Sequence, residues 1–525
     1  MSVAAVLRLK ARYLHIPIKL SAEKAMVILR RADNAALVTY FEAAIGEDHD
    51  YDFLACWDGK DQVGTDLELE IRGGAVEWQT WPQSNEKLPA CPAAVSAPVR
   101  PRWHFTCERG WLNDPNGLFY YQGVYHLFFQ HSPFTLQWTN RNMCWGHAVS
   151  RDLLHWQELA PAIVPDETGL CWSGGALLDH QNATGLQTDE HPPILLFYTA
   201  AGTFAPQPVP FTQAMAYSCD GGWTFRKYQG NPVIGPLQQE SRDPKVVYYP
   251  PGRFWVMVLF IAWRGENAQF AWFRSDDLLN WHLLQELEVE KNGECPDFFT
   301  LTDSAGELKW VFMTASGTYQ IGQFDGRGFQ PETPWRSLRA DWGQNGLYAV
   351  QTWSNAPAGR CILIGWLRSE PYPGAAFSQQ MTLPLELALQ DDADRGYCLT
   401  ARPVAEFQDL PGVGSTDFQP GLSADSYHVW LNTSRTADFT LCIRSGKLQF
   451  SARKQTLLWG DDEFLLPPDS SLELEIVVDT MSWEVFLDGG RQLLAVSQLA
   501  IDCDRAVGLT ADPDDVRWFR VKALV

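Results

Sequence analysis

Residues 111–117 read WLNDPNG and open an aromatic run that decides the fold class. Asn, Asp, Pro and Gly are the main turn formers, and Asn-Gly between apolar runs is a strong hairpin signal. The next residues, GLFYYQGVYHLFFQ (117–130), form two β-prone aromatic runs around Gln122-Gly123. The stretch therefore predicts strands joined by tight turns. Asp114, in its centre, either shapes a turn or carries chemistry.

Three similar segments recur further along the chain, about 60 residues apart. SRDLLHW begins at Ser150, SCDGGWTF at Ser218 and SDDLLNW at Ser275. Ser-Asp followed by Trp is also ordinary turn chemistry, so each match alone says little. Together they favour a β-propeller, with several short strands and one Asp-containing turn in each blade. At this period, residues 102–390 have room for five blades.

The flanking regions have a different pattern. Residues 1–95 contain short alternating runs such as DLELEIRGG, which predict a small N-terminal β domain. LPACPAAVSAPVRP (88–101) is rich in Pro and Ala and predicts a linker. Residues 405–525 alternate with period two in SYHVWLN, KLQFSARK and SWEVFLDGG, which predicts a C-terminal β-sandwich. The predicted fold class is therefore all-β, with the propeller between two smaller β domains.

Composition narrows the partners and the compartment. The chain has 525 residues and a formal net charge of −22, which repels nucleic acid and anionic membrane surfaces. Its 23 Trp, 28 Phe and 16 Tyr suit a β-rich core and also a protein that stacks rings on sugars. We expect neither a nucleic-acid partner nor a membrane partner, because there is also no uncharged apolar run of about 18 residues.

The cysteines favour a reducing compartment. There are 11 Cys, scattered and odd in number, with no zinc-spaced Cys or His pairs. We therefore expect reduced thiols, no metal site and a cytoplasmic setting. The segment before Arg8 is too short for a secretory apolar region. A secreted protein stays open as an alternative if a leader precedes this sequence.

Three acids have unusual neighbours. Asp114 lies in LNDPNG, Asp243 in SRDPKVVYY and Glu294 in GECPDFF, each with Pro one or two residues later and apolar residues beyond. Pro stiffens the backbone and biases the preceding residue toward an extended conformation, so each acid should stand at the start of a strand. In a propeller the inner strands line a central channel, where three such acids could converge.

Converging carboxylates repel each other, so that one stays protonated while another ionises. Glycoside hydrolysis needs this combination, since one carboxylate attacks the anomeric carbon and one acid protonates the leaving oxygen. Taken singly, each acid could equally be a turn cap or half of a surface ion pair. The sequence spacing does not decide between these interpretations.

The chain resembles glycoside hydrolase family 32, the β-fructofuranosidases that include invertases, exo-inulinases and levanases. The similar motifs run in order over residues 102–525: WLNDPNG, YHLFFQHSP, WGHAVSRDLLHW, CWSGGA, SRDPKV, ECPDFF, ILIGWL, YPGAAFSQQMTLPLEL and VVDTMSWEVFLDGG. The segment before residue 100 is similar, less specifically, to a β-rich extension on some bacterial exo-acting members.

The resemblance implies roles for the acids. Asp114 matches the nucleophile, Glu294 the general acid/base and Asp243 the transition-state stabiliser. Arg242 would hold the acid/base or the sugar. The positions implied to line a terminal fructose pocket are Asn113, Gln130, Trp138, Ser173 and Trp366.

The implied reaction is hydrolysis of terminal β-D-fructofuranosyl residues from fructans, fructooligosaccharides or sucrose, with retention and in the exo mode. It needs no cofactor and no metal. A homodimer is compatible with the extra β domain.

The chain also departs from the family pattern, at Trp172, Gly175, Phe377, Gln379 and Leu385, which we expect at the pocket rim or at blade closure. These departures affect substrate preference. Three alternatives stay open: a fructosyltransferase that uses the same acids, a non-catalytic fructan-binding module, and a five-bladed enzyme acting on arabinose or xylose chains.

Overall fold

The computed structural model describes residues 2–47, 49–74, 83–87, 100–238, 240–290, 293–339, 346–369, 372, 374–392, 396–415, 424–444, 446–460, 462–466, 471–498 and 507–524. The described chain is almost entirely β-structure, with one short helix α2(Ala405–Gln408) after the central sheets. Short 3-10 turns are η1(Lys60–Gln62), η3(Gly202–Phe204), η4(Pro357–Gly359), η5(Asp488–Gly490) and η6(Pro513–Asp515). Most of the predicted linker at 88–101 lies outside the described residues.

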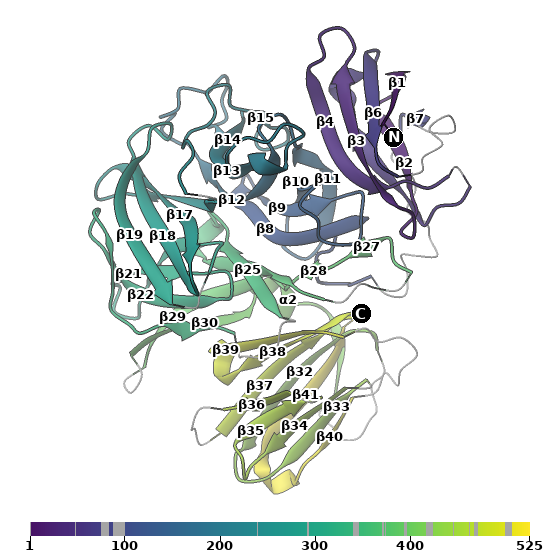
Figure 1. Cartoon of the computed structure of the whole chain (residues 1–525). Coiled ribbons are helices and arrows are strands. Elements are labelled where there is room, and N and C mark those ends of the chain that lie inside the picture. Colours follow the sequence, from purple (N-terminus) through teal and green to yellow (C-terminus); the bar gives the residue numbers. More distant parts are fainter. Residues whose placement is uncertain are drawn as a thin grey trace.

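The N-terminal part consists of two small sheets (Figure 1, purple). One contains β1(Ser2–Arg8), β6(Asp66–Arg72), β3(Lys24–Arg31) and β4(Leu37–Ala44), and the other β5(Phe53–Asp58), β2(Tyr13–Ile18) and β7(Gln83–Asn85). β6, DLELEIR, alternates between exposed and buried side chains as its sequence predicts. Phe134 and Leu136 of the next region complete the apolar core of these sheets, and Phe41 stacks on Phe134 with ring centroids 3.9 Å apart.

Five sheets follow in chain order. The first holds β8(Gly110–Tyr121), β9(Val124–Ser132), β10(Cys144–Ser150) and β11(Trp156–Ile163). The second holds β12(Leu170–Leu178), β13(Ile194–Ala201), β14(Thr212–Ser218) and β15(Arg226–Lys227). The third holds β16(Arg242–Tyr249), β17(Phe254–Arg264), β18(Asn267–Ser275) and β19(His282–Glu290). The fourth holds β20(Asp297–Thr302), β21(Leu308–Met313), β22(Thr318–Phe324), β23(Phe329–Pro331) and β24(Arg336–Ser337). The fifth holds β25(Leu347–Thr352), β26(Ile362–Leu367), β28(Gln380–Met381), β29(Leu385–Asp392) and β30(Gly396–Pro403).

The first strands of these sheets make a closed ring. β8 contacts β12, β12 contacts β16, β16 contacts β20, β20 contacts β25, and β25 contacts β8. Sheets arranged radially around a central set of strands are the architecture of a β-propeller. The strand β27(Phe377–Ser378) comes from the segment that follows β26 and pairs in parallel with Gly110 and Trp111 of β8, which joins the last sheet to the first.

The recurring Ser-Asp turns occupy one structural position. Ser150, Ser218 and Ser275 end the third strand of the first, second and third sheets, and each hydroxyl donates to the Asp two residues later. The next position has a positive φ in all three turns, at Leu153, Gly221 and Leu278. The weak sequence repeat therefore marks the same turn in three successive sheets.

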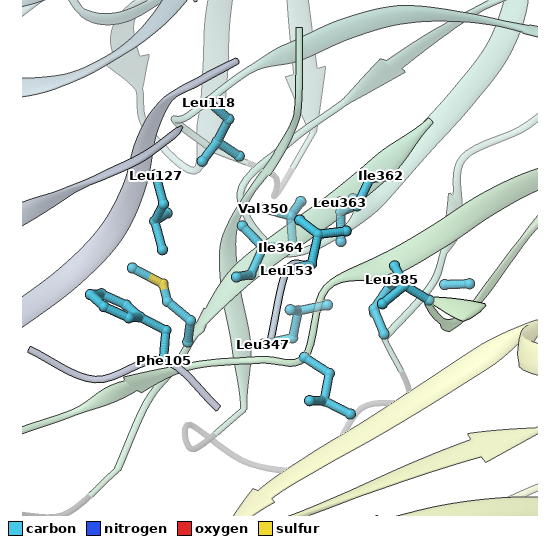
Figure 2. Packing of buried hydrophobic residues seen from close by; sticks show 14 of the residues in the cluster. Phe105, Leu118, Leu127, Leu153, Leu347, Val350, Ile362, Leu363, Ile364 and Leu385 are labelled. Atoms are coloured by element: carbon cyan, nitrogen blue, oxygen red, sulfur yellow. The ribbon is translucent and has the colours of Figure 1, made fainter. Parts of the chain in front are cut away.

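A large apolar cluster joins the first and fifth sheets (Figure 2). Leu118 and Leu127 of the first sheet lie in it together with Val350 and Ile364 of the fifth. The fully buried side chains in this cluster hold the ring closed at the point where its first and fifth sheets meet, because burying an aliphatic side chain contributes about 1.5–3 kcal/mol.

The C-terminal part consists of two antiparallel sheets (Figure 1, yellow-green). One contains β31(Gly412–Ser415), β41(Val516–Leu524), β32(Tyr427–Ser434), β37(Ser471–Val478), β38(Ser482–Leu487) and β39(Gln492–Ser497). The other contains β36(Asp462–Leu465), β35(Thr456–Trp459), β34(Gly446–Ser451), β33(Phe439–Ile443) and β40(Val507–Thr510). Both sheets contribute to a single apolar cluster, for example Leu431 from one and Leu441 from the other.

A buried ionic triad ties this part to the central sheets. His104 lies between Asp479 and Glu484, at 2.9 and 3.1 Å, and all three side chains are inaccessible to solvent. Asp479 also accepts hydrogen bonds from the backbone N–H groups of Arg102 and Trp103. The two carboxylates outweigh the cost of burial and raise the pKa of His104 to about 9, so the imidazole is charged at neutral pH.

Candidate active site

One cavity of about 380 Å³ lies beside the ring of first strands. All nine residues that the sequence singles out line it: Asn113, Asp114, Gln130, Trp138, Ser173, Arg242, Asp243, Glu294 and Trp366. They come from the first, second, third and fifth sheets and from the segment before the fourth. The tertiary structure thus brings together residues that are up to about 250 positions apart in the chain.

Asp114 projects from a bulge in β8. The register between β8 and β9 shifts between Leu112 and Pro115, which leaves Asn113 and Asp114 out of the regular ladder. Bulges re-aim side chains and are common beside active sites. The carboxylate of Asp114 accepts a 2.6 Å hydrogen bond from the hydroxyl of Ser173 and a 3.1 Å bond from Nδ2 of Asn113.

The surroundings of Asp114 have opposing effects on its proton. Burial raises the pKa of Asp114 above its usual value, the hydrogen bond from Ser173 lowers it, and the charge of Glu294 raises it. Hydrogen-bond donors aimed at a buried carboxylate favour its ionised form. The donors therefore keep a half-buried carboxylate usable as a nucleophile.

Asp243 has a strained backbone in the third sheet. Its φ is 65°, a left-handed conformation that non-glycine residues rarely adopt, and the β16–β17 register shifts between Arg242 and Lys245. The N–H of Asp243 donates to Oγ1 of Thr199, and its Oδ2 accepts the N–H of Cys295 at 3.0 Å. Burial raises the pKa of Asp243 to about 7, with Arg242 opposing the rise.

Glu294 stands on the segment before β20, also with a positive φ, of 35°. Its Oε2 accepts two hydrogen bonds from Arg242, at 3.1 Å from Nε and 2.7 Å from Nη2. Its Oε1 accepts a 2.5 Å bond from the hydroxyl of Tyr348. Both carboxylate oxygens are therefore held in one orientation, which suits a group that must transfer a proton at a defined atom.

The other predicted pocket residues differ in exposure. Asn113, Gln130 and Ser173 are buried lining residues of the cavity, as is Asp243. Trp138 is 54% exposed and stands at the edge. Trp366 is fixed by a 3.0 Å hydrogen bond from its Nε1 to Oε1 of Gln379.

The positions that depart from the family pattern lie at the pocket and at the ring closure. Trp172 lines the cavity, and Gln379 holds a pocket residue. Phe377 is in the strand that joins the last sheet to the first. Gly175 faces the backbone of Pro244 on the neighbouring sheet, and Leu385 is buried in the core shared by the first and fifth sheets.

Besides these nine residues the cavity is lined by Trp172, expected from the sequence at the pocket rim or at blade closure, and by four residues that the sequence did not indicate: Met143, Glu240, Cys295 and Tyr348. Cys295 is the most central, since its thiol lies 3.7 Å from Oδ2 of Asp114 and 3.6 Å from Oδ2 of Asp243. Its place in ECPDFF, directly after Glu294, was the available signal. Tyr348 carried no local signal, because its segment LYAVQT contains neither an acid beside Pro nor one of the recurring turns.

Within the described ranges, no group of three or more His, Cys, Asp or Glu side chains could hold a metal ion. In the same part of the chain, no helix is long and apolar enough to cross a membrane.

Comparison with known proteins gives the family. Residues 104–403 match the model of the glycosyl hydrolases family 32 N-terminal domain, which is more than half of the chain. The chain belongs to glycoside hydrolase family 32. Among family 32 relatives, levanase from Bacillus subtilis is 33% identical over 457 residues, 75% of this chain and 65% of that protein. Invertase from Schizosaccharomyces pombe is 35% identical over 338 residues, 58% of this chain and 55% of that protein.

The matches thus span less than two thirds of the length of these family 32 relatives. The fold comparison extends further. The structure of exo-inulinase from Aspergillus awamori superposes with a TM-score of 0.72 and 25% identity, covering 82% of this chain and 99% of that one. The β-fructofuranosidase of Schwanniomyces occidentalis, at 24% identity and a TM-score of 0.71, shows the same fold over 83% of this chain.

Proposed function

We propose that this protein is a retaining, exo-acting β-fructosidase that hydrolyses terminal β-D-fructofuranosyl residues of fructans, fructooligosaccharides or sucrose. The observation that carries the proposal is the convergence of Asp114, Asp243 and Glu294 in one cavity, with Glu294 held at both oxygens. The relatives named levanase, invertase and exo-inulinase support the substrate class.

In the first step Asp114 is the nucleophile. Its carboxylate oxygen Oδ1, which accepts the 3.1 Å hydrogen bond from Asn113, forms a bond to the anomeric carbon of the terminal fructosyl unit, while the glycosidic C–O bond breaks. Glu294 donates its proton to the departing oxygen, so the leaving group departs as a neutral alcohol. Asp243 is linked to this site by Cys295, the residue after Glu294, whose N–H and thiol both approach Oδ2 of Asp243. Asp243 accepts hydrogen bonds from fructose hydroxyls as positive charge develops on the sugar ring.

In the second step the roles of Glu294 reverse. As a carboxylate it removes a proton from water, the oxygen of which bonds to the anomeric carbon as the ester bond to Asp114 breaks. The product is β-fructose, and both carboxyl groups return to their starting protonation states. Arg242 and Tyr348 keep the Glu294 carboxyl in place through both steps.

The lining of the cavity supports exo-action. It includes the buried polar residues Asn113, Gln130, Ser173 and Asp243 beside the proposed nucleophile. An exo-acting enzyme needs such groups to hold the hydroxyls of a terminal fructosyl unit. We therefore assign release of single fructose units to this site.

The proposed architecture has three units. The catalytic unit is a five-bladed propeller, because five sheets supply the ring of first strands. Its extent, set at 102–390 from the sequence, is better drawn to Pro403, since β29 and β30 pair with the fifth sheet. Residues 1–95 form the N-terminal β domain and 405–525 a β-sandwich around one shared core. The cytoplasmic setting and the possible homodimer stay predictions.

The first experiment resolves products over time from sucrose, inulin and levan by chromatography. We expect free fructose from the start without a ladder of intermediates. New larger oligosaccharides would assign the protein to the fructosyltransferases instead, and binding without any product would favour the fructan-binding module. Fructose released from none of the three substrates would contradict the proposal.

A second experiment tests retention. In water–methanol mixtures a retaining enzyme transfers fructose to methanol as methyl β-D-fructofuranoside, which does not mutarotate, whereas an inverting enzyme would form the α-anomer. Asp114→Asn and Glu294→Gln are the matched variants, each close in size to the native residue. In each variant kcat should fall by a factor of at least about 10²–10⁴, while thermal unfolding stays cooperative.

A further inference from the structure

A half-exposed tryptophan lies beside the catalytic segment without lining the cavity. Trp263, near the end of β17, is 47% exposed. Its six-membered ring packs directly on Gly293, where an added Cβ would come within 2.0 Å of the ring. Gly293 immediately precedes Glu294, so the indole can occupy this place only because residue 293 has no side chain.

Trp263 also belongs to the wall that orients Glu294. The centroid of its ring lies 5.5 Å from that of Phe260. The guanidinium of Arg242 lies over the same Phe260 ring, 4.3 Å from its centroid. Arg242 in turn holds Oε2 of Glu294. The layers Trp263, Phe260 and Arg242 therefore connect the protein surface with the proton-transferring carboxyl.

Exposure gives the direction out of the cavity. Asp243 is 4% exposed, the side chain of Glu294 is 26% exposed, and Trp263 is 47% exposed. A fructosyl unit held between Asp114 and Asp243 has its glycosidic oxygen at Glu294, since Glu294 must protonate that oxygen. The sugar attached to that oxygen then lies on the outer side of Glu294, the residue that follows Gly293, on which Trp263 packs.

We propose that Trp263 is the platform on which the leaving-group sugar stacks, and so a specificity-determining residue for the sugar next to the scissile bond. The inference rests on the proposed β-fructosidase function. The ligand is a neutral hexose unit, whose C–H face packs on an indole while its hydroxyls stay in water. A rigid, half-exposed aromatic ring offers contact area at little cost in conformational entropy.

The test compares substrates that differ only on the leaving side. Methyl β-D-fructofuranoside releases methanol and makes no contact with a sugar platform, whereas sucrose and the trisaccharide 1-kestose release a sugar. For Trp263→Ala we expect kcat/KM to fall about tenfold on sucrose and 1-kestose, the usual scale for removing an aromatic anchor. On methyl fructoside the loss should be about tenfold smaller than on these two substrates, because there only the support that Trp263 gives to Gly293 and to Phe260 is removed. Trp263→Phe keeps a ring and should lose only a few-fold on the sugar-releasing substrates.

Trp223 provides the matched control, since it is 51% exposed, packs edge-on against the buried His126 and does not line the cavity. Trp223→Ala should change none of the three substrates by more than about twofold. Equal losses on all substrates for Trp263→Ala and Trp263→Phe would mean that Trp263 acts only by packing on Gly293, and would overturn the inference. Unchanged kinetics in both variants would overturn it too. If wild type released fructose from no substrate, the proposed function itself would fail, and the inference with it.

Discussion

The hydroxyl of Ser173 on β12 donates a 2.6 Å hydrogen bond to Oδ2 of Asp114 on β8, which joins the first two sheets at the proposed nucleophile. Asn113 and the thiol of Cys295 approach the same carboxylate. These donors favour the charged form of a carboxyl whose pKa burial raises. The ring of strands therefore positions the donors as well as the acids.

Removing the Ser173 hydroxyl should shift the pH dependence of activity. In Ser173→Ala the pKa of Asp114 rises further, because a donor to its ionised form is lost. The acidic limb of the kcat/KM profile should then move to higher pH, and kcat/KM at neutral pH should fall about 10–100-fold. Steady-state kinetics from pH 3 to 9 measures both effects. Ser173→Thr keeps a hydroxyl and should retain the wild-type limb; a limb unchanged in Ser173→Ala would contradict the assignment.

The two hydrogen bonds from Arg242 to Glu294 should contribute more to kcat/KM than the positive charge of Arg242 does. Arg242→Lys keeps the charge but cannot reach Oε2 with two nitrogens in a fixed plane. We expect kcat/KM to fall about 10²-fold, the scale for a misplaced catalytic group. Arg274→Lys is the control, because Arg274 also pairs with an acid, Asp276, and lies over Phe254, but on the surface. That variant should stay within about twofold, and similar losses in both would sink the prediction.

Asp243 should make stability depend on pH. Its folded pKa, about 7, is raised above the unfolded value of about 3.9, so the folded state loses stability as pH rises from about 4 through 7. The side chain of Asn does not titrate. The difference in unfolding temperature between Asp243→Asn and wild type should therefore grow, in favour of the variant, as pH rises across that interval. We expect a gain of at least about 2 °C at pH 8 and less at pH 5, with activity lost. Scanning calorimetry at the two pH values measures it, and a gain that shrinks toward pH 8 would contradict the raised pKa.

The His104 triad should stabilise the contact between the propeller and the C-terminal sheets. His104→Ala leaves Asp479 and Glu484 buried without their cation, which costs about 3–5 kcal/mol. Because the folded pKa of about 9 lies above the unfolded value of about 6.5, the triad contributes fully below pH 6.5 and is lost as pH rises through 9. Denaturant unfolding should therefore show a larger loss at pH 6 than at pH 10.

The control for this triad is His155→Ala, because His155 pairs with Asp152 on the surface with its side chain 69% exposed. An exposed pair is worth about 0–1 kcal/mol, so the unfolding free energy should hardly change. A loss equal to that of His104→Ala would mean that burial of the triad is not what stabilises the junction.

Much of the site was predictable from the sequence because its signals are local. Asp114, Asp243 and Glu294 each sit in a short motif with Pro nearby, and the Ser-Asp turns recur in the chain at the period of the sheets. The alternation of apolar and polar residues in segments such as DLELEIR is likewise local, since the two faces of a strand alternate. The all-β class and the three acids follow from such patterns alone.

What the sequence by itself determined is therefore the inventory: the strands, the turns, the acids and the resemblance that names their roles. The tertiary structure alone decided which groups meet. Tyr348 reaches Glu294 from a strand 54 residues away, Cys295 touches two acids from different sheets, and Trp263 covers Gly293. The positive φ values of Asp243 and Glu294 were equally invisible, because neither residue prefers that conformation. Such contacts depend on register shifts and on closure of the ring, which arise only when distant strands pair, and residue preferences carry no record of them.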